Sequence, residues 1–358
     1  MTTHRVAFVG TGADPENPSS EGFAMAYQHA SAYERLGNCE LVGCADIVRE
    51  NAEAFADRHD IDEDGVFEDY EEMVEAVDPD VVSVCTPPAT HADIVVGLAE
   101  SGVPDAIHCE KPMAMTWGGA KRMAAAAERA DVALTFNHMR RFGDPFRDAK
   151  ALLDDGAIGD LRRIEYSWGN FYDNGTHAID MCNYFNDEYA PSWVIGQLDY
   201  REEEVYFGTH NENQMLASWE YENGVYGMAT TGPASEIADG DWRLVGTEGV
   251  MDVHLTDEVA VRVRSLADDE TESFEYDGLA GEGESCIDRA IADVVQSVET
   301  GEESELSARN ALNATEIIFA GYESVRRRGR VDLPLDIEDN PLEEMVASGE
   351  LSPRSSAD

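Results

Sequence analysis

Basic residues are scarce in this chain, and lysine is nearly absent. Of its 358 residues, 25 are lysine or arginine, and only Lys111, Lys121 and Lys150 are lysine, whereas 74 are aspartate or glutamate. The formal net charge of −49 argues against nucleic acid and anionic membrane surfaces as partners. The acids are spread along the whole chain, so a compact body repels itself unless salt screens it. We therefore expect a salt-rich cytosol, as in a halophilic archaeon; the alternative is an ordinary acidic protein.

The chain also lacks long apolar runs, paired cysteines and a leader. No stretch reaches the roughly 18 consecutive apolar residues of a membrane-spanning helix. None of the six cysteines forms a CxxC pair, so no disulfide framework is expected. The N-terminus passes directly into a strand-like run at 5–9, without a basic and apolar leader. These features predict a soluble, cytoplasmic protein.

The first third of the chain alternates short apolar runs with helix-like stretches. This alternation predicts a parallel sheet covered on both faces, which is an α/β doubly wound (Rossmann) domain over residues 1–137. Residues 66–67 are expected to add a short strand. The expected strands are 5–9, 41–45, 81–85, 106–109 and 132–136, and the expected helices are 22–36, 47–57, 69–77, 89–101 and 117–130.

The pattern changes after about residue 143. A helix over 144–155 precedes several alternating runs, which predict a mainly antiparallel sheet, and two further helices follow. We expect an α+β domain over residues 138–334 and a peripheral acidic tail over 335–358. The alternating runs are 161–169, 192–200, 213–221, 224–231, 241–246 and 258–264, and the later helices are 284–299 and 306–327.

Two features at the ends of the first two strands indicate a dinucleotide site. Gly10-Thr11-Gly12 lets the backbone turn sharply beside a pyrophosphate, although the usual third glycine is replaced by a polar loop over 13–20. Asp46 ends the second strand, where an acid can bind both ribose hydroxyls and repel a 2′-phosphate, so NAD is favoured over NADP. Asp46 could instead cap the following helix, and nearby Arg49 could reach a 2′-phosphate.

Lys111 has the most distinctive surroundings of the three lysines. It follows the apolar run 106–109 and lies between Glu110 and Pro112. Proline fixes its own backbone angle and biases the preceding residue toward an extended shape. Lys111 is therefore expected on a stiff segment at the C-terminal end of a strand, where open α/β sheets bind ligands. The alternative is a surface lysine in a salt bridge with Glu110.

A candidate for acid–base chemistry lies in the run 173–180 of the second domain. Thr176 or Asn174 is expected to cap a helix that begins here, which places His177 in its first turn. The positive end of a helix disfavours imidazolium, so His177 is expected to be neutral and able to accept a proton. Asp173 could bind the other ring nitrogen or contact a substrate.

A zinc site is the alternative interpretation of the same run. It would combine His177, Asp180 and Cys182. Their spacing matches no strong zinc pattern, so we predict no metal.

Several motifs, in order along nearly the whole chain, resemble the Gfo/Idh/MocA oxidoreductase family. These enzymes are sugar and polyol dehydrogenases related to glucose–fructose oxidoreductase and inositol dehydrogenase. The motifs are Gly10-Thr11-Gly12, Asp46, Cys85-Thr86-Pro87-Pro88-Ala89-Thr90-His91, Cys109-Glu110-Lys111-Pro112, residues 136–142, residues 173–180 and Arg330-Val331-Asp332-Leu333-Pro334.

The resemblance implies secondary-alcohol oxidation with NAD. His177 would remove the hydroxyl proton, Lys111 would stabilise charge on the same oxygen, and Asp173 would orient His177. Asp180 would only support the helix start. It also implies a homodimer or homotetramer formed through an open sheet face. The residues implied to lie at the cofactor are Gly10, Thr11, Gly12, Asp46, Thr86, Pro87, His91, Glu110, Lys111 and Asn137, with His91 also shaping the Thr86-Pro87 turn.

Two other functions share this fold. One is a glycosidase that uses bound NAD transiently, and the other is a non-catalytic NAD-binding regulator. The presence of both Lys111 and His177 argues against the regulator.

Overall fold

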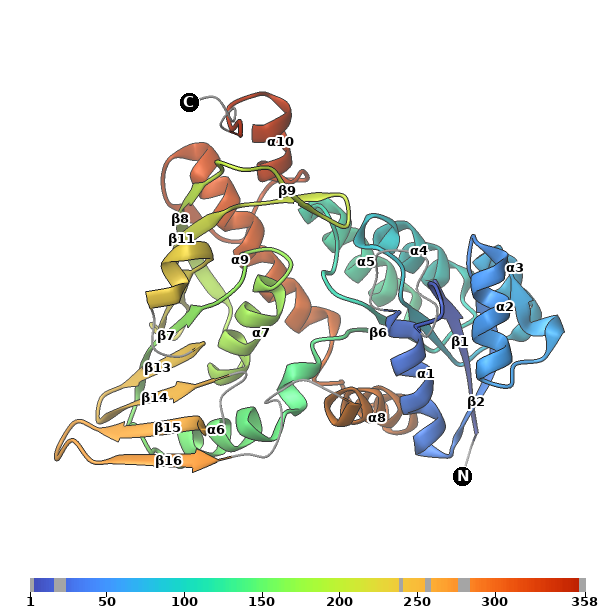
Figure 1. Cartoon of the computed structure of the whole chain (residues 1–358), viewed down its shortest axis with the longest axis horizontal. Helices are drawn as coiled ribbons and strands as arrows, with labels where there is room; N and C mark the ends of the chain where they lie inside the picture. The colour runs from blue at the N-terminus through green and yellow to red at the C-terminus, as the bar shows by residue number, and fades with distance from the viewer. Residues whose placement is uncertain (1–2, 16–23, 238–240, 255–258, 276–283, 354–358) are drawn as a thin grey trace. The chain divides into compact units, whose positions relative to one another are not determined.

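The chain forms two compact units, which are described separately here (Figure 1). The computed structural model describes residues 3–15, 24–237, 241–254, 259–275 and 284–353. The first unit comprises residues up to Ala114, Gly119–Asn137 and Glu284–Ala311, and the remaining residues form the second. Residues 284–311 were expected in the second domain, whereas in the structure they pack in the first unit. Residues 16–20 of the expected polar loop lie outside the described residues.

A six-stranded parallel sheet forms the centre of the first unit, with the order β3-β2-β1-β4-β5-β6. The predicted Rossmann sheet, including the short strand at 66–67, is confirmed. Its central strands β4 and β5 are buried along their length, as expected of a sheet with both faces covered. The strands are β1 (His4–Val9), β2 (Cys39–Ala45), β3 (Val66–Phe67), β4 (Val81–Val84), β5 (Ala106–Cys109) and β6 (Ala133–Phe136).

Helices surround this sheet, and the late helix α8 joins them. The helices are α1 (Met25–Leu36), α2 (Arg49–Arg58), α3 (Tyr70–Val77), α4 (Pro88–Ser101), α5 (Trp117–Ala130) and α8 (Glu284–Thr300), with a 3₁₀ turn η1 (Glu63–Gly65). α8 packs against α1, β5 and β6. Arg35 of α1 and Asp288 of α8 form an ion pair, with Nη2 and Oδ1 2.5 Å apart. The N–H of Phe136 also donates to Leu306 O, so the segment after α8 binds the edge of β6.

A nine-stranded mixed sheet forms the second unit, with the order β16-β15-β14-β13-β7-β12-β11-β8-β17. Only β7 and β12 pair in parallel among its described strands. The predicted mainly antiparallel sheet is thus confirmed. The strands are β7 (Leu161–Ser167), β8 (Pro191–Asp199), β11 (Gln214–Tyr221), β12 (Tyr226–Thr230), β13 (Trp242–Gly246), β14 (Gly249–Val253), β15 (Val259–Ser265), β16 (Thr271–Glu275) and β17 (Val331–Asp332), beside a separate hairpin of β9 (Glu204–Tyr206) and β10 (Thr209–Asn211).

One face of this sheet is buried and the other is open. Burial alternates along β11, β12, β13 and β14, as expected of a sheet covered on one side. Helices cover the buried face; for example, Trp242 Nε1 donates to Ala178 O of α7 at 3.1 Å. The helices are η2 (Met139–Phe142), α6 (Asp144–Asp154), α7 (Gly175–Phe185), η3 (Gly232–Ile237), α9 (Ala308–Arg327) and α10 (Pro341–Ala347), of which α9 begins in the first unit.

The acidic tail expected at 335–358 contains an ordered helix. Asn340 caps α10, because its side chain accepts hydrogen bonds from the N–H groups of Leu342 and Glu343. Residues 354–358 lie outside the described residues. No helix in the described part of the chain is both long and apolar enough to cross a membrane.

Candidate active site

Glu110 forms the centre of a buried polar cluster directly after β5. Its Oε1 accepts hydrogen bonds from His29 Nε2 at 3.0 Å and from Asn137 Nδ2 at 2.7 Å. Its Oε2 accepts the backbone N–H of Lys111 at 3.2 Å. Burial alone would raise the pKa of Glu110, but the hydrogen bond and charge of His29, together with Asn137 and Lys111, lower it to about 2. Glu110 is therefore an anion at neutral pH and holds the backbone of Lys111.

The turn after β4 is joined to the segment after Lys111 by His91. Its Nε2 lies 2.7 Å from Thr86 O, and its Nδ1 lies 3.0 Å from Pro112 O. Burial lowers the pKa of His91. His91 therefore faces backbone carbonyls on both sides and shapes the Thr86-Pro87 turn, a role that the sequence also suggested.

The turn after β1 is fixed by glycine geometry and by Asp46. Gly10 has φ +82°, and a Cβ there would lie 2.5 Å from Thr86 Cγ2, so no other residue fits. Asp46 Oδ2 accepts the N–H of Gly12 at 2.9 Å and the hydroxyl of Thr11 at 3.2 Å. Asp46 Oδ1 accepts the N–H of Val48 at 2.9 Å. The carboxylate thus ties the end of β2 to the glycine turn.

Asp46 is not the N-cap residue of α2, so that alternative interpretation is wrong. The N-cap residue is Val48, whose side chain makes no cap bond, and Asp46 bonds the N–H of Val48 and the side chain of Asn51. Arg49, which could have reached a 2′-phosphate, places its Nε 2.8 Å from Glu53 Oε1 in an ion pair along α2.

The first unit contains features that fit a bound dinucleotide. Gly10 and Gly12 both have positive φ, so the backbone after β1 can approach a pyrophosphate closely. Asn137 is buried, and its Oδ1 accepts no hydrogen bond from the described residues. That oxygen could accept a hydrogen bond from the carboxamide of a nicotinamide. The residues present therefore fit a nicotinamide dinucleotide.

His177 lies in the first turn of α7, as the sequence predicted. It is buried, with 6 % of its surface exposed, whereas Asp173 in the preceding loop is half-buried. The expected cap is wrong, because Asn174 occupies the N-cap position but makes no side-chain cap bond. The Thr176 hydroxyl instead lies 2.9 Å from His138 Nε2.

A buried ionic cluster secures the start of α7. Arg141 Nε and Nη2 donate to the two oxygens of Asp180 at 2.8 and 2.6 Å, and Nη1 lies 2.6 Å from Glu188. His138 Nδ1 is 3.2 Å from Asp180 Oδ1. Burial would raise the pKa of Asp180, but Arg141 and His138 lower it to about 2. The ring of His138 also contacts that of His177, with centroids 5.6 Å apart.

The zinc interpretation finds no support in this arrangement. Asp180 is engaged by Arg141 and His138, and burial raises the pKa of the Cys182 thiol well above its ordinary value. In the ranges that the structure describes, no three His, Cys, Asp or Glu side chains are grouped to hold a metal ion.

A second buried glutamate supports the loop that carries Asp173. Glu212 Oε1 accepts the N–H of Phe171 at 2.7 Å and the hydroxyl of Thr231 at 2.9 Å. Its Oε2 accepts the Tyr322 hydroxyl at 2.7 Å. Burial raises the pKa of Glu212. Sequence reasoning missed Glu212, His29 and Arg141, because no local pattern marks their distant partners.

Comparison with known proteins identifies the family of both units. Residues 4–138 match the family model described as "Oxidoreductase family, NAD-binding Rossmann fold", and residues 151–333 match "Oxidoreductase family, C-terminal alpha/beta domain". The chain belongs to the Gfo/Idh/MocA oxidoreductase family. The family resemblance found in the sequence is thereby confirmed, and the family model for the first unit is NAD-binding.

The curated relatives of this chain share only low sequence identity with it. The rhizopine catabolism protein MocA of Rhizobium meliloti is 26 % identical over 70 % of this chain and 78 % of its own length. The D-glucoside 3-dehydrogenase of Escherichia coli is 29 % identical over 50 % of this chain and 53 % of its own length. The chain spans about half the length of most of the curated relatives it matches.

Solved structures share the fold over nearly the whole chain. An oxidoreductase from Agrobacterium radiobacter in complex with NAD+, L-tartaric acid and magnesium has a TM-score of 0.73 at 18 % identity, over 92 % of this chain and 98 % of its own. The WlbA dehydrogenase from Bordetella pertussis, in complex with NADH and UDP-GlcNAcA, has a TM-score of 0.71 at 17 % identity, over 93 % of this chain and all of its own.

Proposed function

We propose that this family member is an NAD-dependent dehydrogenase that oxidises a secondary alcohol of a sugar, polyol or sugar derivative. The observation that carries the proposal is the anionic Glu110 cluster, which fixes the backbone of Lys111 at the carboxyl end of β5. Ligands of open α/β sheets bind at this edge. Relatives named as glucoside and inositol dehydrogenases support the substrate class.

The proposed chemistry, which the family resemblance implies, gives His177 and Lys111 different roles toward the reacting hydroxyl group. A ring nitrogen of His177 accepts the hydroxyl proton while the carbinol hydrogen leaves as hydride. The ammonium of Lys111 donates a hydrogen bond to the same oxygen and stabilises its developing negative charge. Asp173 orients His177. The nicotinamide, when bound, supplies the hydride acceptor.

The cofactor is proposed to be NAD rather than NADP. The Asp46 carboxylate lies at the end of β2 and would repel a 2′-phosphate. Arg49 is paired with Glu53 on its own helix, which favours the same preference. The ribose hydroxyls would bind Asp46 by replacing weaker donors, such as the Thr11 hydroxyl at 3.2 Å.

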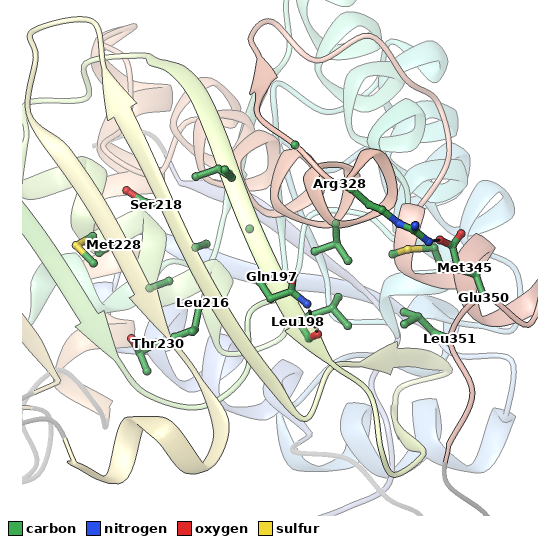
Figure 2. Close-up of a pocket in the computed structure, with 16 residues that line it drawn as sticks. Gln197, Leu198, Leu216, Ser218, Met228, Thr230, Arg328, Met345, Glu350 and Leu351 are labelled. Carbon is green, nitrogen blue, oxygen red and sulfur yellow. Dashed lines mark hydrogen bonds and ion pairs between the residues drawn. The ribbon is translucent and has the colours of Figure 1, made fainter.

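A second copy of this chain is proposed to cover the open face of the large sheet. Ile195, Leu216 and Met228 lie on the neighbouring strands β8, β11 and β12, and 39–46 % of the surface of each residue is exposed. Figure 2 shows Leu216 and Met228 on this sheet, which borders a hollow of about 730 Å³. Homodimers or homotetramers formed through this face would bury these apolar side chains. We also propose a cytoplasmic location in a salt-rich cell, on the basis of the −49 charge.

The test is a screen of inositols, glucosides, polyols and sugar acids with NAD and NADP in molar KCl, read as formation of the reduced cofactor. We expect NAD reduction with at least one compound and its loss in His177→Ala. Cleavage of a glycoside without net formation of NADH would instead identify the glycosidase. NAD binding with neither reaction would identify the non-catalytic regulator.

A further inference from the structure

His29 is a buried polar residue in a helix face that is otherwise small or aromatic. It lies in the middle of α1 with no exposed surface, among buried neighbours such as Ala26, Ala30 and Tyr33. A polar ring at such a position costs free energy unless its nitrogens are hydrogen-bonded. The partners of those nitrogens therefore indicate why histidine occupies this site.

Both ring nitrogens of His29 have polar neighbours from the sheet. Nε2 is 3.0 Å from Glu110 Oε1, and Nδ1 is 3.6 Å from Cys85 Sγ. Nε2 is also 3.1 Å from Asn137 Nδ2, which itself donates to Glu110 Oε1. Because Glu110 is ionised, it can only accept, so Nε2 is the donor in its contact with Glu110. Burial and the charge of Glu110 raise the pKa of the Cys85 thiol well above its ordinary value, so the thiol keeps its own proton. Glu110 thus receives a directed N–H bond from α1.

This bond holds the carboxylate that in turn holds Lys111. Two donors, His29 Nε2 and Asn137 Nδ2, converge on Oε1, which leaves Oε2 turned toward the N–H of Lys111. If the donor from His29 is removed, a buried anion loses one of its hydrogen bonds and gains freedom to rotate. The backbone of Lys111 would then lose its fixed partner.

We propose that His29 is a positioning residue for Lys111 and acts through Glu110. The inference rests on the proposed dehydrogenase function, in which Lys111 contacts the reacting oxygen. A purely structural role for His29 would require only a side chain that packs in the same space. The proposal requires a hydrogen-bond donor at the place of Nε2.

Two substitutions, compared as a matched pair, separate a packing role of His29 from a hydrogen-bonding role. In His29→Gln the side-chain amide reaches the position of Nε2 and can donate to Glu110. In His29→Asn the shorter amide reaches only the position of Nδ1. We expect His29→Gln to rescue most of kcat, whereas His29→Asn lowers kcat by about 100-fold, because a displacement of about 1 Å at a reacting group has an effect of that size.

The scarcity of lysine provides a readout that needs no substrate. Each purified protein is treated with an isotope-labelled acylating reagent that reacts with amines, in molar KCl. The acylation rates of Lys111, Lys121 and Lys150 are then compared by mass spectrometry. We expect His29→Asn to change the rate at Lys111 several-fold, with His29→Gln close to the wild type and the other two lysines unchanged. Glu110→Gln in combination with His29→Asn should add little further change, because the two act as a unit.

The outcomes distinguish this inference from the function on which it rests. Equal rates at Lys111 in the wild type and His29→Asn would overturn the positioning role, whatever the enzyme oxidises. An equal loss of kcat in the Gln and Asn variants, accompanied by an equal fall in their melting temperatures, would also overturn the positioning role and leave a packing role for His29. A wild type that reduces no cofactor, but whose Lys111 rate still depends on His29, would remove the dehydrogenase function alone.

Discussion

Glu110 in the first unit and Glu212 in the second are both buried, and each accepts hydrogen bonds from one backbone N–H and two side chains. Their pKa values nevertheless move in opposite directions. The side-chain donors to Glu110 are an imidazole and an amide, with the Lys111 charge nearby, and they lower its pKa to about 2. The side-chain donors to Glu212 are the hydroxyls of Thr231 and Tyr322, and burial keeps its pKa raised. The comparison indicates that the donors around a buried carboxylate set the direction in which its pKa moves.

Lys111→Ala is expected to have the largest effect, because it removes the charge that the Glu110 cluster holds in place. Loss of one preorganised donor to a developing oxyanion raises the barrier by about 2.7–4 kcal/mol, which is about 100- to 1000-fold in kcat. NADH binding, measured by fluorescence titration, should persist. Lys121→Ala is the matched control and should leave turnover unchanged. Turnover of Lys111→Ala within a few-fold of the wild type would remove Lys111 from the mechanism.

Glu110→Gln and Glu212→Gln test the comparison directly. At neutral pH we expect Glu110→Gln to lower the free energy of unfolding by about 1–3 kcal/mol. The amide nitrogen of the glutamine would face hydrogen-bond donors that now bind the Glu110 carboxylate, and those donors would lose an acceptor. Glu212→Gln should be neutral or stabilising, since Thr231 and Tyr322 carry hydroxyls that can also accept a bond. Chemical unfolding in molar salt measures both values. Equal destabilisation would contradict the opposite pKa shifts of the two carboxyls.

The pH dependence of the same variants should have opposite signs. The folded pKa of Glu110 lies below its ordinary value of 4.5, so its stabilisation is present above about pH 4.5 and is lost as pH falls toward 2. The folded pKa of Glu212 lies above 4.5, so the wild type loses stability relative to Glu212→Gln as pH rises from about 4.5 through that raised pKa. Unfolding at a series of pH values checks both slopes, and parallel slopes would refute the contrast.

Asp46 represents a third environment, because its carboxylate is 8 % exposed and binds backbone N–H groups. Asp46→Ala should weaken the binding of NAD and reduce the preference for NAD over NADP. The substitution removes both the partner of the ribose hydroxyls and the repulsion of a 2′-phosphate. The ratio of kcat/KM values for the two cofactors measures this effect. A wild type that already prefers NADP would show that the assignment of Asp46 is wrong.

The exposed acids should give the smallest effect per residue. Moving from 1 M to 0.1 M salt lengthens the Debye length from about 3 to about 10 Å, so repulsion reaches between neighbouring acids. We expect the melting temperature and activity to rise with KCl well beyond physiological strength. Equal stability and activity in dilute buffer and in 2 M KCl would remove the salt-rich origin but leave the dehydrogenase proposal intact.

The sequence predicted the parts of this molecule that local patterns encode. Alternating apolar runs predicted both sheets, because periodicity is set by the burial of each strand. The strands β14 (Gly249–Val253) and β16 (Thr271–Glu275) were not predicted, because β14 begins with a glycine, which is depleted in strands, and β16 is mostly polar and exposed. Gly10, Asp46 and Glu110 follow strands, and motifs at those positions are visible in the chain. His29 and Glu212 were not predicted, because their roles depend on partners 81 and 41 residues away.

The return of α8 to the first unit has a consequence for how this protein is made. A ribosome releases β1 to β6 early, but α8 and the segment that binds the edge of β6 emerge only after residue 284. Until then α1 lacks its helical neighbour, and the cofactor-binding sheet has an unpaired edge. Synthesis of the second unit's sheet must therefore precede completion of the first unit. A fragment that ends at Asn137 should be aggregation-prone, whereas one that appends residues 284–311 through a linker should fold.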